Sequence, residues 1–121
     1  MRTFELGGTT VLVEDGEGPP VGTMLIGDVL TASFEAAART VAITVARLEP
    51  AFFDLRSGVA GEVVQTLVQY ERRLAVVGEL PDTALASRSF SAFVREGNRG
   101  DGPWFVASLD ELSERLGAIG R

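Results

Sequence analysis

The chain has 121 residues, with 11 basic side chains, 17 acidic side chains and a net charge of −6; 45% of it is hydrophobic. This length predicts one domain over residues 1–121, and the apolar fraction is too high for a disordered chain. Cysteine and histidine are both absent. Their absence excludes disulfides, thiolate nucleophiles, Cys/His metal sites and imidazole catalysis. The sequence also contains no carboxylate metal motif, P-loop or dinucleotide-binding pattern, so we expect no metal and no cofactor.

The composition also restricts the expected cellular location and the classes of binding partner. The first residues contain no apolar segment typical of a signal peptide, and no apolar run approaches the roughly 18 to 20 residues of a spanning helix. We therefore expect a cytoplasmic protein without a membrane segment. Binding to nucleic acid needs a clustered basic patch. The close basic pairs in this acidic sequence are Arg72-Arg73 and Arg95/Arg99, which are expected to be solvated helix ends, so nucleic acid is not an expected partner. A protein partner or a small polar ligand is expected instead, and a homo-oligomer stays open.

The first elements along the chain are a hairpin and a helix. Residues 3–6 and 9–14 are β-prone runs that flank Gly7-Gly8, and two glycines between such runs are typical of a hairpin turn. Residues 15–20 are rich in glycine and proline and predict a long loop. A helix is predicted after Asp28 as N-cap, with Phe34 among its recurring apolar positions.

Strands and helices alternate in the rest of the chain. Residues 41–46 and 74–78 are apolar on both faces, as expected of strands covered on both sides, and residues 104–107 form a short last strand. Helices are predicted from about residue 58 to 72, from Ser87 or Ser89, and after a capping box formed by Ser108 and Glu111. The predicted fold is therefore α/β, with an N-terminal β-hairpin followed by α-β-α-β-α-β-α. Its sheet is mixed but mostly parallel and packs with four helices.

Residues 52–62, Phe-Phe-Asp-Leu-Arg-Ser-Gly-Val-Ala-Gly-Glu, resemble the signature of the DUF4180 family of bacterial domains of unknown function. The resemblance continues through residues 74–78 and returns at Ser89, Phe93, Glu96 and Asn98. It covers nearly the whole chain and implies no activity.

The order of elements also resembles that of STAS domains of the anti-sigma-factor-antagonist type. In those domains a strand leads to a turn at a helix N-terminus, where a partner kinase phosphorylates a serine. Ser57, which precedes Gly58 before the second helix, corresponds to that serine. The resemblance therefore implies a STAS-like fold and a regulatory role.

Ser57 has two compatible interpretations. Its hydroxyl can cap the second helix, which contributes about 1 kcal/mol. It can also be a phosphorylation or anion-binding site, because the free N–H groups at a helix start favour negative charge, and Arg56 could help to hold the anion. The glycines Gly58 and Gly61 do not form a dinucleotide-binding pattern, and we expect Gly61 to allow close packing of the helix on the sheet.

Asp54 and Glu62 are the candidate catalytic carboxylates. Glu62, Gln65 and Gln69 recur at helical spacing and are expected to share one surface. Because loops at one end of a parallel sheet converge, we expect Glu96 and Asn98 at the same edge. The alternative interpretation is a solvated face with a structural hydrogen-bond anchor.

Two classes of function follow from these residues. The first is a small cytoplasmic regulatory or interaction module, switched by phosphorylation or anion binding at the helix N-terminus that contains Ser57. The alternative is a cofactor-independent isomerase, cyclase or lyase with Glu62 or Asp54 as general base, or a small-ligand-binding protein on the same surface. An exposed shallow surface would favour the first, and a carboxylate enclosed in a pocket would favour the enzyme.

Overall fold

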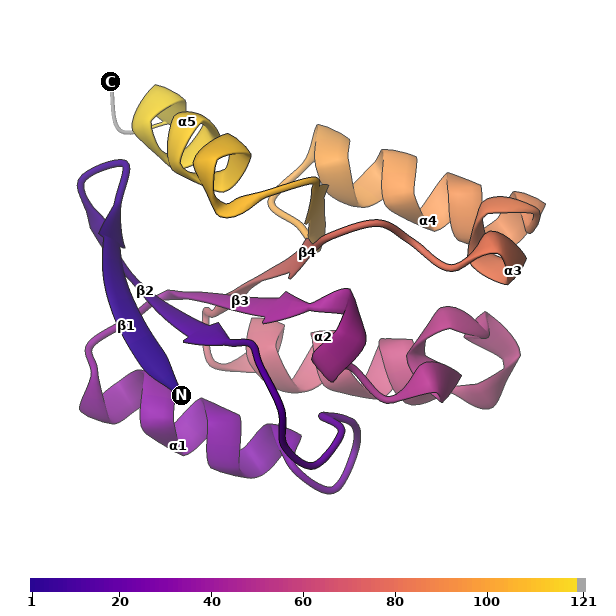
Figure 1. Ribbon diagram of the computed structural model, residues 1–121, viewed down its shortest axis with the longest axis horizontal. Helices are drawn as coiled ribbons and strands as arrows, with labels where there is room; N and C mark the ends of the chain where they lie inside the picture. The colour runs from indigo at the N-terminus through magenta and orange to yellow at the C-terminus, as the bar shows by residue number, and fades with distance from the viewer. Residues whose placement is uncertain (120–121) are drawn as a thin grey trace.

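One five-stranded mixed sheet organises the chain in the structure, a computed structural model that describes residues 1–119 (Figure 1). The last two residues of the predicted domain, 120–121, lie outside the described residues. The strands follow one another across the sheet in sequence order: β1 (Arg2–Leu6), β2 (Thr9–Glu14), β3 (Thr40–Thr44), β4 (Arg73–Val77) and β5 (Trp104–Val106). Only the first pair, β1 with β2, is antiparallel, and the other neighbours run parallel. The predicted hairpin and the mostly parallel sheet are confirmed.

The described residues contain one more helix than we predicted. The α-helices are α1 (Ile26–Glu35), α2 (Val59–Gln69), α3 (Asp82–Leu85), α4 (Arg88–Arg99) and α5 (Leu109–Ile119). The prediction of four helices is therefore wrong, because α3 precedes the helix that was expected from Ser87. A helix of one turn is too short to produce a recurring apolar pattern, so periodicity does not reveal it.

Three helices cover the same face of the sheet. The core on this face joins α1, α2 and α4 to alternate residues of the strands, among them Leu12, Val41, Ile43, Leu74 and Val76. Phe52 and Phe90 are 0% and 1% exposed in this core, so the segment before α2 and the start of α4 are both anchored there. This face carries the loops that will form the candidate site.

The opposite face of the sheet is covered by α5, which lies beside the hairpin (Figure 1). Leu112 and Leu116 pack there against Val11, Ala42 and Ala75. At the hairpin turn, the backbone N–H of Gly7 donates to Ser113 Oγ at 3.1 Å. A Cβ at Gly7 would lie only 2.5 Å from the backbone N of Gly117. The turn therefore needs a glycine for the close approach of α5 as well as for its backbone angle.

The first helix differs from the prediction in its start and in the exposure of Phe34. It begins at Ile26, and Asp28 lies in its first turn, so Asp28 is not the N-cap. Phe34, expected on the apolar face, is 49% exposed, and the Arg72 guanidinium lies over its ring at 4.1 Å. No helix among residues 1–119 has both the length and the apolar character needed to span a membrane.

The approach of α5 to the hairpin predicts unequal effects of two neighbouring substitutions. Both Gly7 (φ 60°) and Gly8 (φ 85°) have left-handed backbones, which cost an alanine roughly 1–2 kcal/mol. Only the Gly7→Ala methyl group meets α5, which adds about 1–3 kcal/mol of overpacking, whereas a Cβ at Gly8 meets nothing within 4 Å. Urea denaturation should show Gly7→Ala as the less stable protein. Equal midpoints for the two variants would contradict this packing.

Candidate functional site

A hollow of about 590 Å³ opens where the chain leaves the carboxyl ends of β3 and β4. We call it the carboxyl-edge hollow, and its lining consists of Pro50, Phe53, Asp54, Leu55, Arg56, Thr83, Ser87 and Ser89. In Figure 1 the arrow of β3 points toward the end of the molecule where α3 lies. Two of the predicted site residues, Asp54 and Arg56, line this hollow, and Ser57 follows them directly in sequence. It is therefore the candidate functional site.

One wall of the hollow is a series of short turns between β3 and α2. The 3-10 turns Pro50–Phe53 and Leu55–Ser57 are separated by Asp54, whose Oδ1 accepts a hydrogen bond from the backbone N–H of Arg56 at 3.1 Å. An aspartate that bonds to the backbone two residues later is a common turn former. Gly58 then takes a left-handed conformation (φ 82°), which lets α2 begin at Val59.

Ser57 is exposed and its hydroxyl already makes two hydrogen bonds. Its Oγ donates to the carbonyl oxygen of Ala51 at 2.6 Å and accepts from the backbone N–H of Val59 at 3.2 Å. The N-cap position itself is Gly58, one residue later than we predicted. Ser57 nevertheless satisfies the first free N–H group of α2, so it performs the capping function that the sequence indicates.

The charged side chains at this hollow face the solvent. Arg56 Nε lies 3.8 Å from Asp54 Oδ1, and the two side chains are 96% and 61% exposed. An exposed pair at this distance contributes little to stability, in the range of about 0–1 kcal/mol. Both groups are therefore available to an incoming partner at low energetic cost.

Hydroxyl groups form the facing wall, at the junction of α3 and α4. Ser87 is the N-cap of α4, where its Oγ accepts from the backbone N–H of Phe90 at 3.2 Å. Ser89 Oγ lies 3.5 Å from Ser87 Oγ, and Thr83 of α3 completes the wall. The sequence indicated Ser87 and Ser89 as helix starts. Thr83 was missed, because nothing in the sequence shows which turn faces α2.

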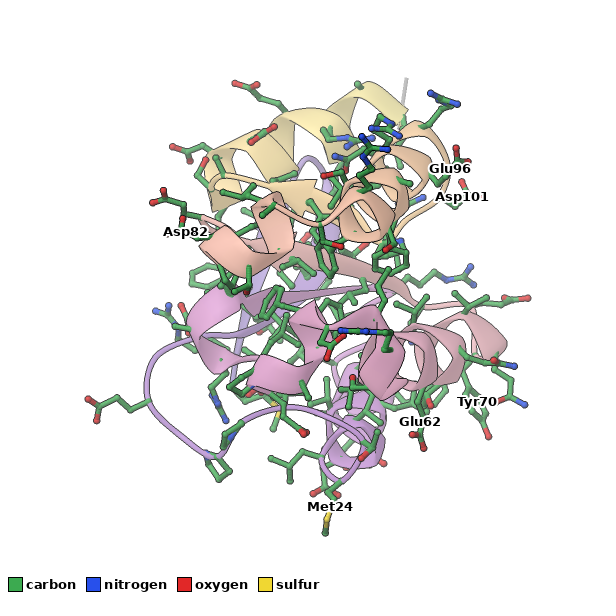
Figure 2. The ribbon with its side chains drawn as sticks, turned by 90° about the vertical axis from the view of Figure 1, so that its right-hand side faces the viewer. Met24, Glu62, Tyr70, Asp82, Glu96 and Asp101 are labelled. Carbon is green, nitrogen blue, oxygen red and sulfur yellow. The ribbon has the colours of Figure 1, made fainter. Side chains whose placement is uncertain are left out.

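The polar face of α2 is exposed as predicted but does not join the carboxyl-edge hollow. Glu62, Gln65 and Gln69 are all exposed. Gln65 and Gln69 line a separate groove of about 430 Å³, together with Gly61, Val64, Val68 and Phe93. Figure 2 shows Glu62 pointing outward from the lower half of the molecule. A Cβ at Gly61 would meet nothing within 4 Å, so the expected close packing of Gly61 on the sheet is wrong.

Glu96 and Asn98 do not reach the carboxyl edge. They lie in the last turns of α4, which leads back to the start of β5, and Figure 2 shows Glu96 well apart from Glu62. The expectation that they share an edge with Ser57 is wrong, because a helix between parallel strands returns the chain to the opposite edge. Asn98 is the anchor of the alternative interpretation: its Oδ1 accepts from the backbone N–H of Phe105 at 2.8 Å and from Arg115 at 3.2 Å.

The sequence did not predict a buried ion pair at the carboxyl end of β2. Glu14 ends β2 with its side chain 4% exposed, and its Oε2 lies 3.1 Å from Nη1 of Arg47, which is 12% exposed. Arg47 also donates to the carbonyl oxygens of Asp15 and Pro19, at 3.2 and 3.0 Å, and so holds the loop that follows β2. Glu14 follows Val11, Leu12 and Val13 at the end of a strand that is buried on both faces, and its place in that run could have revealed its burial.

Comparison with known proteins identifies the family. The sequence profile of DUF4180, described as a domain of unknown function, matches residues 7–116, and the chain belongs to this family. Neither a curated protein nor a solved structure matches the chain. Within residues 1–119, no group of three or more Asp or Glu side chains is arranged to hold a metal ion.

The bonds of Ser57 predict a measurable contribution to stability. Ser57→Ala removes both hydrogen bonds and leaves a helix N–H unsatisfied, which should lower the free energy of unfolding by about 1 kcal/mol. Ser89→Ala is the matched control, because this exposed hydroxyl caps no helix and surface changes of this kind stay within about 0.5 kcal/mol. Urea denaturation of both variants tests the comparison, and equal stabilities would contradict it.

The buried pair of Arg47 with Glu14 and the exposed pair of Arg56 with Asp54 should differ strongly in their contribution to stability. Arg47→Ala leaves the Glu14 carboxylate buried without its partner and should destabilise the protein by about 3–5 kcal/mol. Arg56→Ala breaks only the exposed pair with Asp54 and should cost about 0–1 kcal/mol. Thermal or urea unfolding measures both. If Arg47→Ala were no more damaging than Arg56→Ala, the loop would not depend on the buried pair.

Proposed function

We propose that this DUF4180 protein is a small cytoplasmic regulatory or interaction module that binds a partner protein at the carboxyl-edge hollow. We further propose that Ser57 is its switch, through phosphorylation or through binding of an anion. The observation that carries the proposal is the exposure of Asp54 and Arg56 on the carboxyl-edge hollow, with the exposed Ser57 directly after them at the start of α2. Nothing encloses these groups, so a macromolecule can reach all three.

The turn that carries the charged groups has a rigid base. Phe53 is 8% exposed and lies among buried aromatic rings, with centroids 5.3 Å from Phe52 and 5.9 Å from Phe90. These rings hold the backbone of the turn in place beneath the exposed side chains of Asp54 and Arg56. A surface with an ordered backbone loses little entropy when a partner binds, which supports a protein partner at this position.

Ser57 has the properties of a switch at this surface. A phosphate would add nearly two negative charges and remove the hydrogen-bond donor that now binds Ala51. The new charge would lie at the N-terminus of α2, next to Arg56, where the helix dipole stabilises anions. Phosphorylation would thus exchange the bond to Ala51 for contacts with helix N–H groups and alter the shape of the hollow.

The similarity of the element order to STAS-domain antagonists supports the same proposal. In those proteins a partner kinase phosphorylates a serine at the turn that leads into a helix. Ser57 lies at the turn that leads from β3 to α2.

The geometry favours this function over base catalysis. A catalytic base of raised basicity needs enclosure, and the Asp54 side chain is 61% exposed. Glu62 is exposed and lies outside the residues that line the carboxyl-edge hollow. Neither candidate carboxylate has the surroundings that the enzyme alternative requires.

Capture of partners from the native host tests the proposed surface. Tagged wild-type protein and an Arg56→Glu variant should differ at least tenfold in the recovery of one specific partner, because charge reversal at a rim disfavours the complex. Arg95→Glu, on the exposed side of α4, makes the same charge change away from this hollow and should retain the partner. Equal recovery by all three proteins would refute the surface.

The switch needs its own measurement. Mass spectrometry of the captured protein should find phosphate on Ser57, and Ser57→Glu should change partner recovery relative to Ser57→Ala. Circular dichroism confirms that both variants remain folded. The switch is excluded if both variants recover every partner as well as the wild type does.

A further inference from the structure

Three arginines line a second hollow, on the opposite edge of the sheet from Ser57. This hollow of about 400 Å³ lies where the chain enters β3, β4 and β5, and we call it the amino-edge hollow. It is lined by Arg39, Thr40, Val68, Glu71, Arg72, Arg73, Asp101 and Gly102. The chain has only 11 basic residues and a net charge of −6, so three in one hollow are a marked local concentration.

The parallel pairing of β3 and β4 brings these arginines together. Thr40 is paired with Arg73 across the two strands, and the backbone N–H of Arg73 donates to the carbonyl oxygen of Arg39 at 2.7 Å. Arg39 and Arg72 thus each precede one member of the paired residues Thr40 and Arg73. Their closeness follows from the strand register and does not depend on flexible loops.

Two of the three guanidinium groups are held in place. Arg72 donates through Nε to Ser33 Oγ at 3.1 Å and through Nη1 to the carbonyl oxygen of Tyr70 at 3.2 Å. Arg73 donates through Nε to the carbonyl oxygen of Asp101 at 3.0 Å, and its guanidinium lies 4.1 Å from the centroid of the Trp104 ring. Side chains already fixed in this way lose little entropy when a ligand binds.

These contacts leave hydrogen-bond donors unused. Nη2 of Arg72 makes no hydrogen bond to the described residues, and the side chain of Arg39 makes neither a hydrogen bond nor an ion pair with them. Nη2 of Arg73 has only the distant Asp101 Oδ1, at 3.8 Å. A guanidinium presents five N–H groups in a planar fork, so several donors remain for an acceptor in the hollow.

The acidic groups at the rim only partly offset the positive charge. Glu71 and Asp101 face the hollow; the Asp101 side chain is fully exposed, and Glu71 makes no ion pair with the described residues. Burial lowers the pKa of Arg73, the charge of Asp101 raises it, and Arg115 lowers it further. Since an arginine stays protonated at neutral pH, the three arginines outnumber the two acids.

We propose that the amino-edge hollow binds a small organic anion through a phosphate or carboxylate group. Oxyanions of both kinds accept the paired N–H groups of a guanidinium fork, which favours arginine over other basic residues at such sites. A volume of about 400 Å³ lies within the range of small-molecule sites. This site is separate from the surface around Ser57 and adds a ligand to the proposed function.

Titration of the ¹⁵N-labelled protein with sodium phosphate, and separately with citrate, tests the site and distinguishes its two chemistries. At constant ionic strength, adjusted with sodium chloride, the amide signals of Arg39, Thr40, Asp101 and Gly102 should shift and saturate with at least one probe. The probe that binds more tightly identifies the preferred group. Shifts confined to Gly58 and Val59 would place the anion at α2 alone and overturn the inference, as would the absence of saturation with both probes.

Variants that remove a positive or a negative charge from the hollow should change the dissociation constant in opposite directions. Arg39→Ala removes an exposed side chain with no bond to lose and should raise the dissociation constant about tenfold. Asp101→Asn removes a negative charge from the rim and should lower the dissociation constant. Arg95→Ala removes the same charge as Arg39→Ala, from a position outside the hollow, and should leave binding unchanged. An unchanged dissociation constant in Arg39→Ala, with the rest of its spectrum intact, would refute the site.

Discussion

Each crossover in this protein carries the chain to the next strand along the sheet, always in the same direction. Such connections are right-handed in nearly all proteins, so repeated steps in one direction place successive helices on the same face. The shared core of α1, α2 and α4 has this origin. The parallel direction of β2 to β5 gathers the starts of α2 and α4 at the carboxyl edge and the entries to β3, β4 and β5 at the amino edge. Both hollows are therefore consequences of the chain's path.

The helix α5 covers the other face of the sheet. Two arginines that lie against the ring of Trp104 connect this helix to the amino edge. Arg115 of α5 and Arg73 of β4 each lie 4.1 Å from the centroid of the Trp104 ring. Arg115 also donates to the carbonyl oxygen of Asn98 at 2.7 Å. Asn98 thus links the end of α4, the start of β5 and α5.

The sequence predicted most of the elements and only part of the site. Local chemistry determines the glycine turn of the hairpin and the cap at Ser108, whose Oγ accepts from the backbone N–H of Glu111 at 3.2 Å. Such features are visible without tertiary information. The position of Glu96 and the exposure of Phe34 depend on helix direction and on partners distant in sequence, Arg72 and Tyr70 among them. Asp54 and Arg56 line the carboxyl-edge hollow because they belong to a turn formed by neighbouring residues, so their proximity could be predicted from the sequence.

The helix α2 runs from the carboxyl edge of the sheet to the amino edge and fixes the distance between Ser57 and the amino-edge hollow. The N-terminus of α2 follows Ser57, and Val68, near its C-terminus, lines the amino-edge hollow. Eleven residues rise about 16 Å along a helix, which is roughly twice the distance over which physiological salt screens a charge. A charge added at Ser57 is therefore weakly felt at the arginines through space. Between the two edges α2 is fixed against the shared core, because its Ala60, Val63 and Leu67 are all 0% exposed there.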